Sequence, residues 1–215
     1  MASTADADRT RVDFWFDPLC PWTWMTSRWL TEVAALRPLD IRWHVMSLAI
    51  LNAGRLDQVP QEYHDLLGPK GLRPVRTLVA VRQSHGNEAV ARLYTALGAV
   101  FHRDGKGPTP EALTEALKSA ELPTELAEHA DATTYDAEVR ASHEAGQKAV
   151  GEEAGSPILA VPGPDATPVG FFGPIVSPVP RSDAALSLWD TVVHAASVPG
   201  FAELKRARTA PPSFD

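Results

Sequence analysis

The chain has 215 residues, of which 44% are hydrophobic and 22% are charged, a balance typical of a globular protein. Its formal net charge is -7 and its basic residues are scattered, which argues against a nucleic-acid-binding surface. No apolar run is long enough to span a membrane, and the polar N-terminus lacks a signal-peptide core, so we expect a cytoplasmic protein without membrane association. The single cysteine, Cys20, excludes an intrachain disulfide and a four-cysteine zinc site.

The first part of the chain predicts a β-α-β unit. Residues 11–17 (RVDFWFD) alternate and are rich in aromatic side chains, which favours a strand. Residues 22–36 carry apolar side chains at helical spacing, and residues 40–48 (DIRWHVMSL) alternate as a second strand does. Residues 1–10 are expected to form a disordered leader.

The middle of the chain predicts helices only. Between residues 56 and 154 we find no convincing strand, and we expect a helical insertion of four or five helices. Thr109 is a candidate N-cap for one of them, because proline and glutamate follow it. Another helix is expected to pack closely through two small residues, Ser142 and Gly146.

Two short strands and a helix are predicted after the insertion. Residues 156–162 and 167–173 are apolar runs separated by a turn sequence, which is typical of a hairpin, and residues 181–196 form an amphipathic pattern. The order β-α-β, helices, β-β-α predicts an α/β fold: a thioredoxin-like core, residues 11–55 and 155–215, with a large all-helical insertion.

Cys20 is the first candidate catalytic residue, because it precedes the predicted helix in the sequence DPLCPWTWM. The unpaired amides and the positive dipole at a helix start favour the thiolate, so we expect a lowered pKa and reactivity near neutral pH. The alternative is a buried, inert cysteine. Pro21 suits the first helical turn, since its missing N–H would have no partner there. Thr23 stands where a C-x-x-C site has its second cysteine, and its hydroxyl is expected to donate to the Cys20 thiolate.

Three further residues are predicted to bind a substrate thiol or an aromatic group. Trp22 either shields the sulfur, forms a wall for an aromatic substrate, or simply packs. Ser156 and Pro157 stand at the start of the predicted strand that follows the insertion. In a thioredoxin-type fold a cis-proline there lies against the active-site cysteine, and the residue before it offers backbone hydrogen bonds to a bound thiol.

Several motifs together resemble the DsbA-like, mycothiol-dependent nitroreductase family. They are DFWFDPLCPW with the SRW that follows it, HVMSLAILN, the Gly-Ser-Pro segment, FFGP and ELKR. The resemblance extends from about residue 11 to the C-terminal PPSFD. It implies a thioredoxin-like fold with an inserted helical domain, as in DsbA and the kappa-class glutathione transferases. It also implies a cytoplasmic enzyme that reduces substrates, including nitroaromatic compounds, with electrons from mycothiol.

The resemblance also suggests site residues. Cys20 matches the family's nucleophile and Trp22 its neighbouring tryptophan. Asn52 and Tyr63 match polar residues that line the family's substrate cleft, and His102 resembles another cleft residue on the insertion. Each of these three has a plainer interpretation: a loop cap for Asn52, half-buried packing for Tyr63 and a surface helix end for His102.

Thr23 departs from the family's C-P-W-C pattern and leaves several mechanisms open. In the first mechanism, a monothiol cycle, mycothiol resolves a mixed disulfide on Cys20. In the second, the protein has moved to S-transferase or isomerase chemistry of the kappa-class type. In the third the threonine is a substitution made to trap an intermediate, for which serine or alanine is the more usual choice. A non-enzymatic protein that binds thiols or other ligands is a further hypothesis.

The expected cofactors and partners are few. The sequences GPKG (68–71) and DGKG (104–107) lack the spacing of a nucleotide-binding loop, and the seven histidines are dispersed, so we expect no tightly bound flavin or NAD and no metal. Mycothiol is implied as the thiol cosubstrate, with a small aromatic or disulfide substrate. The protein is expected to be a monomer or homodimer.

Overall fold

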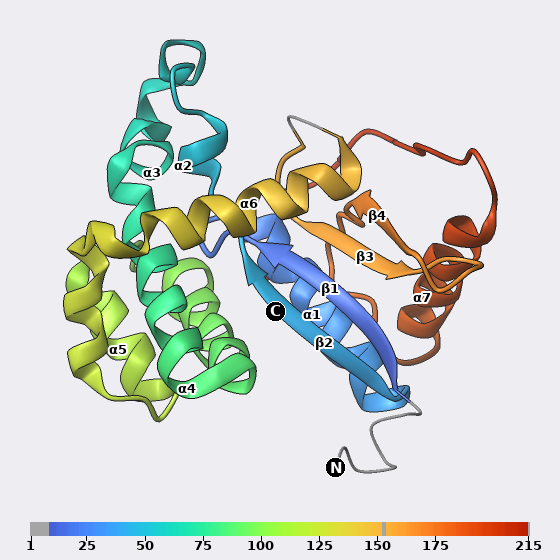
Figure 1. The fold of residues 1–215 in the computed structure, drawn as a ribbon, viewed down its shortest axis with the longest axis horizontal. Helices are drawn as coiled ribbons and strands as arrows, with labels where there is room; N and C mark the ends of the chain where they lie inside the picture. Colours follow the sequence, from blue (N-terminus) through green and yellow to red (C-terminus); the bar gives the residue numbers. More distant parts are fainter. Residues whose placement is uncertain (1–8, 152–153, 215) are drawn as a thin grey trace.

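The computed structural model describes residues 9–151 and 154–214, and it places a four-stranded sheet beside a lobe of helices (Figure 1). The strands follow the order β2-β1-β3-β4 across the sheet. Strand β1 runs parallel to β2 and antiparallel to β3, and β4 is antiparallel to β3. The strands are β1 (Thr10–Phe16), β2 (Leu39–Val45), β3 (Ile158–Pro162) and β4 (Pro168–Phe172).

Helices α1 and α7 contact each other and the sheet, whereas α6 runs from the helical lobe across the sheet (Figure 1). A π-helical turn, Ala99–Arg103, follows α4, and several short 3-10 turns join the other elements. The α-helices are α1 (Pro21–Leu36), α2 (Leu48–Leu51), α3 (His64–Leu67), α4 (Leu72–Gly98), α5 (Pro110–Ser119), α6 (Asp136–Val150) and α7 (Ser182–Ser197).

The alternation of β1 sends its side chains to two different layers. Phe14 and Phe16 belong to the buried cluster that also holds the apolar face of α1. Trp15 points the other way and meets α6, where a Cβ at position 146 would overlap its indole, so only glycine allows this approach. On the same helix the Ser142 hydroxyl donates to the Val45 carbonyl at 2.6 Å. The predicted close packing through small residues is therefore confirmed.

The helical lobe is tied to the sheet by aromatic packing. Tyr94, on α4, stacks on Phe16 with ring centroids 3.8 Å apart, and both side chains are fully buried. Trp43 on β2 meets both rings edge-on. One continuous hydrophobic cluster thus extends from the sheet into the insertion, so the strand that leads to the active-site turn is held by both parts.

The predicted thioredoxin-like α/β fold with a helical insertion is confirmed. The described part of the segment between α2 and β3 contains helices and turns and no strand. Thr109 caps α5 as predicted, by accepting a hydrogen bond from the Ala112 amide at 3.1 Å. The expected leader falls largely on residues outside the described part, and its last predicted residue, Thr10, already belongs to β1.

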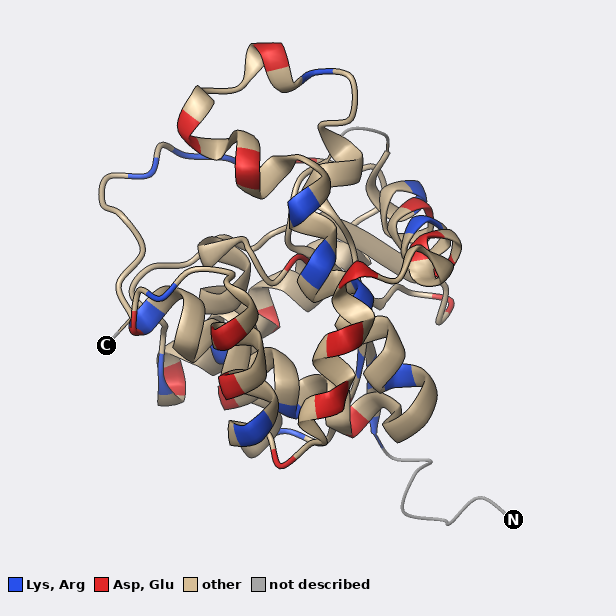
Figure 2. Cartoon of the chain, turned by 90° about the vertical axis from the view of Figure 1, so that its left-hand side faces the viewer, with Lys and Arg blue, Asp and Glu red and all other residues tan. Residues whose placement is uncertain are grey.

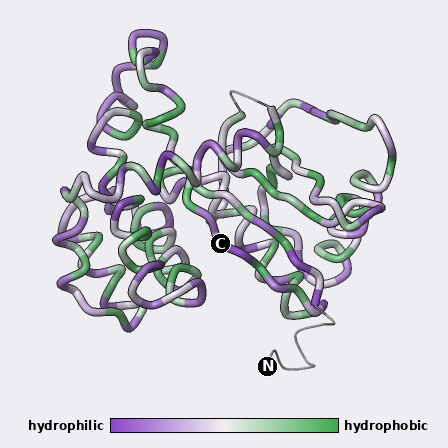
Figure 3. The backbone as a smooth tube through the Cα atoms, in the orientation of Figure 1, coloured by the Kyte–Doolittle hydropathy of each residue, from purple (hydrophilic) through white to green (hydrophobic). Residues whose placement is uncertain are grey.

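Surface charge and hydropathy agree with the sequence. Figure 2 shows acidic and basic residues interspersed over the visible helices. Figure 3 shows β3 as a continuous hydrophobic stretch within the sheet, and its first four residues are buried. None of the helices in the described ranges combines the length and apolar character needed to cross a membrane.

Candidate active site around Cys20

Cys20 lies at the junction between β1 and α1, as the sequence predicts. It is the N-cap residue of α1, and Pro21 is the first helical residue. The Cys20 amide donates to the Asp17 carbonyl at 3.1 Å, which closes the turn that leads into the helix. The side chain is 9% exposed, and its thiol donates to the Ser156 carbonyl oxygen at 3.6 Å. The sulfur thus faces the backbone that precedes β3.

The predicted lowering of the Cys20 pKa is wrong for this conformation. Burial is the largest influence and raises the pKa of the Cys20 thiol, because the thiolate loses its hydration, and the nearby Asp17 carboxylate raises it further. The Thr23 hydroxyl and the amides of Thr23 and Trp22 act in the opposite direction, and they are weaker than burial. The helix start does stabilise the thiolate, but only against a larger desolvation cost. The thiol side chain makes no capping hydrogen bond to the helix.

The Thr23 hydroxyl forms a hydrogen bond with the Ser156 hydroxyl, in addition to lying near the Cys20 sulfur. The two hydroxyl oxygens are 2.6 Å apart, and the Ser156 hydroxyl also accepts a hydrogen bond from the Asp17 amide at 3.0 Å. Thr23 is fully buried and Ser156 is 6% exposed. The position of the missing second sulfur is therefore occupied by one member of a buried network that holds the Ser156 backbone beside Cys20.

Asp17 is a buried acid that sequence reasoning missed. Its carboxylate oxygens accept hydrogen bonds from the Leu19 amide at 2.8 Å and from the Leu48 amide at 2.6 Å. Burial raises the pKa of Asp17 to about 6 despite these two donors. The carboxyl joins the Cys20 turn to the start of α2. Its signal in the sequence is an acid at the end of an apolar strand, directly before the Pro-Leu-Cys turn.

Pro157 follows Ser156 through a cis peptide bond. Both residues lie just before β3, which begins at Ile158, two residues later than the predicted strand start. The Pro157 carbonyl accepts a hydrogen bond from the Gly173 amide at 2.9 Å, which fixes this corner to the end of β4. The structure therefore brings Cys20, Thr23, Ser156 and Pro157 together at one end of the sheet.

His102 reaches the same turn from the helical insertion. Its Nε2 donates to the Pro18 carbonyl at 2.9 Å, so Nδ1 is the unprotonated nitrogen of the neutral ring. Burial lowers the pKa of His102 to about 4. Its ring lies beside Trp24, with centroids 6.2 Å apart, and stacks on Phe214 at 5.9 Å. A neutral His102 thus ties the helical insertion to the turn that carries Cys20, through its hydrogen bond to Pro18.

The C-terminal segment 198–214 passes over the N-terminal half of α1. The Arg208 guanidinium lies 4.9 Å from the centre of the Trp22 ring, a cation–π contact, and Phe214 packs on Trp24 at 5.9 Å. Ser177 fixes the segment by donating to the Pro211 carbonyl at 3.1 Å and accepting from the Ser213 amide at 3.0 Å. Trp22 is half-buried, and its role as a wall for a substrate stays a prediction. Neither Arg208 nor Phe214 has a sequence signal for its contact with α1, because each acts across nearly the whole length of the chain.

Asn52 and Tyr63 are not joined to this cluster by the contacts found in the described residues. Asn52 is the C-cap of α2 and donates through Nδ2 to the Leu48 carbonyl at 2.7 Å, which is the plainer of its two interpretations. Tyr63 lies in a 3-10 turn, and 48% of its surface is exposed. Their assignment to a substrate cleft stays a prediction.

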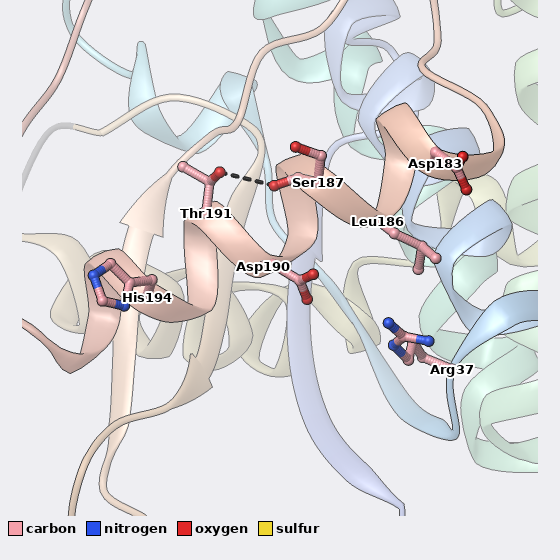
Figure 4. Close-up of a pocket in the computed structure, with 7 residues that line it drawn as sticks. All are labelled: Arg37, Asp183, Leu186, Ser187, Asp190, Thr191 and His194. Carbon is pink, nitrogen blue, oxygen red and sulfur yellow. Dashed lines mark hydrogen bonds between the residues drawn. The ribbon is translucent and has the colours of Figure 1, made fainter.

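Among the described residues, neither a possible metal cluster nor the hollow along α7 falls at this site. Among residues 9–151 and 154–214, no group of three or more His, Cys, Asp or Glu side chains could hold a metal ion. A hollow of about 600 Å³ lies along α7, where Figure 4 shows Arg37 facing Asp190, and its lining includes neither Cys20 nor Ser156. Its lining side chains are mostly exposed, so it has none of the burial that marks the Cys20 site.

Comparisons with known proteins identify the family of the chain. A model of the Rv2466c-like family, described as mycothiol-dependent nitroreductase Rv2466c, matches residues 19–206. The uncharacterized protein Rv2286c of Mycobacterium tuberculosis is 32% identical over 206 residues, which cover 93% of this chain and 83% of that protein.

Two solved structures share the fold. The cytosolic disulfide reductase DsbM from Pseudomonas aeruginosa has a TM-score of 0.55 and 20% identity, over 86% of this chain and 98% of that chain, and it has also been solved with GSH. The probable DsbA oxidoreductase SCO1869 from Streptomyces coelicolor has a TM-score of 0.57 and 19% identity, over 94% of each chain. At these identities the likeness shows the fold.

Proposed function

The chain belongs to the Rv2466c-like family of mycothiol-dependent nitroreductases, and on that premise we propose that it is a cytosolic oxidoreductase acting through the single sulfur of Cys20. The observation that carries the proposal is the position of that sulfur. It lies at the start of α1, 3.6 Å from the Ser156 carbonyl oxygen, which is the backbone acceptor just before Pro157. A substrate thiol that enters a mixed disulfide with Cys20 would meet the same stretch of backbone.

The proposed cycle needs two molecules of a small thiol, RSH, and mycothiol is the thiol that the family name supplies. With a substrate disulfide R′SSR′ as oxidant, the Cys20 thiolate attacks one sulfur, forms Cys20–S–S–R′ and releases R′S⁻. One RSH then attacks the R′ sulfur of the mixed disulfide and restores Cys20, and a second RSH converts the released RSSR′ to RSSR and R′SH. Thr23 cannot perform this second step, because its oxygen does not resolve a disulfide, so the resolving thiol must come from solution.

A nitroaromatic substrate fits the same cycle with balanced electrons. Cys20–SH and RSH together give up two electrons and two protons to the nitro group, which yields the mixed disulfide, a nitroso compound and water. The next RSH releases RSSR and regenerates Cys20. The protein's own part is to place the sulfur, to accept hydrogen bonds through the Ser156 backbone, and to offer the half-buried Trp22 ring as a surface for the aromatic substrate.

Burial of the sulfur imposes one condition on this cycle. The thiol is protonated and donates to the Ser156 carbonyl, so its proton must leave before attack. The Thr23 hydroxyl and the amides of Trp22 and Thr23 favour the thiolate once a substrate or solvent displaces that hydrogen bond. We infer that the described state is the resting one, and that substrate entry precedes activation of the thiol.

A second candidate function is supported by the same raised pKa. If Cys20 stays a protonated donor, a bound thiol rather than Cys20 is the nucleophile, as in an S-transferase or isomerase of the kappa-class type. The thiol would then end in a thioether product or return unchanged, with no disulfide formed. Thr23 in place of a second cysteine agrees with this alternative.

Intact-mass analysis separates the two. The reduced protein is exposed to mycothiol disulfide, with glutathione disulfide for comparison and Cys20→Ser as the control. The redox proposal expects a single mycothiol adduct, absent from the variant and removed by excess mycothiol. No adduct, together with a thioether product from an electrophilic aromatic substrate, would reject the redox cycle in favour of conjugation.

A further inference from the structure

A second pocket is lined by Trp24 and three arginines, and Cys20 is not part of its lining. It has a volume of about 240 Å³ and lies between α1, the end of the helical insertion and the C-terminal segment. Trp24 and Phe214 supply flat aromatic walls. The charged part of the lining consists of Arg28 on α1, Arg103 at the end of the π-helical turn, and Arg181 before α7.

The charges around this pocket do not balance. Arg103 pairs with Asp104 at 2.9 Å, and Arg181 pairs with Glu32 at 3.1 Å. Arg28 pairs with no carboxylate among the described residues, although its guanidinium is the most enclosed of the three. Its one hydrogen bond runs from Nε to the Ser27 hydroxyl at 3.2 Å. A local excess of positive charge is thus held inside a chain whose formal net charge is -7.

The position of Arg28 costs its guanidinium part of its hydration, and no carboxylate among the described residues compensates for that loss. Burial lowers the pKa of Arg28, and the neighbouring Arg181 lowers it further. The guanidinium lies 5.6 Å from the centre of the Trp24 ring, and that cation–π contact is its main electrostatic partner apart from Tyr94. A half-buried guanidinium with unused N–H donors is complementary to a carboxylate, which it can bind through two parallel hydrogen bonds.

We propose that this pocket binds a small aromatic carboxylate, with its carboxylate on Arg28 and its ring against Trp24 and Phe214. The volume is smaller than that of a typical drug-sized pocket, so a single ring with one acidic group is the class that fits. Arg103 and Arg181 line the same pocket, and because each is already paired with a carboxylate they leave Arg28 as the group that would bind the anion. Binding here does not require the sulfur chemistry proposed for Cys20.

The test is an equilibrium titration of the full chain with benzoate, followed by the NMR signal of the Trp24 indole N–H and by calorimetry. Benzyl alcohol lacks the charge and acetate lacks the ring, so both should bind about tenfold more weakly or worse. Arg28→Gln should weaken benzoate binding by about tenfold or more, and Arg28→Lys by less. Arg140→Gln, an exposed arginine on α6, is the matched control and should bind as the wild type does.

Several results would overturn the proposal. They are the absence of saturable benzoate binding in the wild type, equal affinity in Arg28→Gln, and benzyl alcohol binding as tightly as benzoate. If Arg28→Gln fails to fold, Arg103→Gln tests the same charge at an exposed position and should weaken benzoate severalfold. The titration is repeated in Cys20→Ser, where unchanged affinity is expected, so that failure of the redox proposal does not affect this result.

Discussion

The Thr23 and Ser156 hydroxyl oxygens lie 2.6 Å apart in the buried space beside Cys20. They join the first turn of α1 to the backbone before β3, two segments separated in the sequence by the whole helical insertion. The contact uses the position at which a dithiol enzyme has its resolving sulfur. At this position the protein therefore has a hydroxyl that hydrogen-bonds Ser156 in place of a sulfur that could resolve a disulfide. Substitutions at Thr23 test both the structural and the redox role of the position.

Thr23→Cys should restore a dithiol site. The side chain at this position lies in the first turn of the helix capped by Cys20, the arrangement of a C-x-x-C motif. Mild oxidation should therefore remove two thiols and two hydrogen masses from the intact protein, as measured by thiol titration and mass spectrometry. The wild type and a Cys20→Ser, Thr23→Cys double variant are the controls. Retention of both thiols after oxidation would mean that the Ser156 network holds the side chain away from the sulfur.

Thr23→Val should destabilise the fold and make the thiol less acidic. The substitution keeps the shape but removes one partner of the buried Ser156 hydroxyl, a loss of about 1–2 kcal/mol in the free energy of unfolding. It also removes a group that lowers the Cys20 pKa, so alkylation of Cys20 should require a higher pH. Urea unfolding and the pH dependence of iodoacetamide reaction measure the two effects. Thr114→Val, an exposed threonine on α5, should change neither.

The Asp17 carboxyl should make folding less favourable as the pH rises from about 4 to about 6. Its pKa in the folded state is raised to about 6, so the folded protein binds more protons than the unfolded chain within that window. The corresponding loss of stability is up to about 3 kcal/mol at neutral pH. Comparing urea unfolding of wild type and Asp17→Asn at about pH 4 and about pH 7 isolates this term. A difference between the two proteins that does not change with pH would contradict it.

Protonation of His102 should oppose that effect. Its pKa is lowered to about 4, so the unfolded chain binds the extra proton first, and stability is lost as the pH falls from about 6.5 to about 4. The two residues therefore act in opposite directions over nearly the same range, and the wild-type profile should be flatter than that of either variant. NMR titration of the His102 ring proton gives the pKa directly, and a midpoint near the ordinary value would reject the buried neutral ring.

Phe214→Ala should release His102 from its stacked neighbour. The phenyl ring covers both His102 and Trp24, so its loss admits water and should move the His102 pKa upward towards its ordinary value. The same NMR titration measures this shift. Phe201→Ala is the matched control, because that phenylalanine lies in the same C-terminal segment but packs on Phe171 instead. Equal titration curves for the two variants would show that Phe214 does not shield the histidine.

The strands, the main helices and the place of Cys20 could be predicted because each has a local pattern. Alternation marks β1, a proline at the first helical position marks the start of α1, and the Ser-Pro pair marks the corner before β3. Small residues on α6 likewise predicted a close approach, which Gly146 makes to Trp15. These features depend on neighbours in the sequence or on the shape of one side chain.

The electrostatics of the site could not be predicted in the same way. The helix start at Cys20 is local and predicts a lower pKa, but the burial of the thiol depends on segments distant in the sequence, such as the Ser156 backbone. That larger contribution reverses the direction. Asp17 was missed for the same reason, since its two amide donors come from different elements. Arg28 is the converse case, because only the folded structure shows that no carboxylate among the described residues pairs with it.

The contact between Cys20 and Ser156 has a consequence for the order of events during synthesis. Cys20 leaves the ribosome early, whereas Ser156, whose carbonyl accepts the hydrogen bond of the thiol, follows only when most of the chain has been made. At about 5–20 residues per second, the thiol is without this partner for roughly seven seconds or more. A nascent or prematurely ended chain therefore carries an accessible cysteine with an ordinary acidity, open to capture by cellular oxidants, while the finished protein withdraws it.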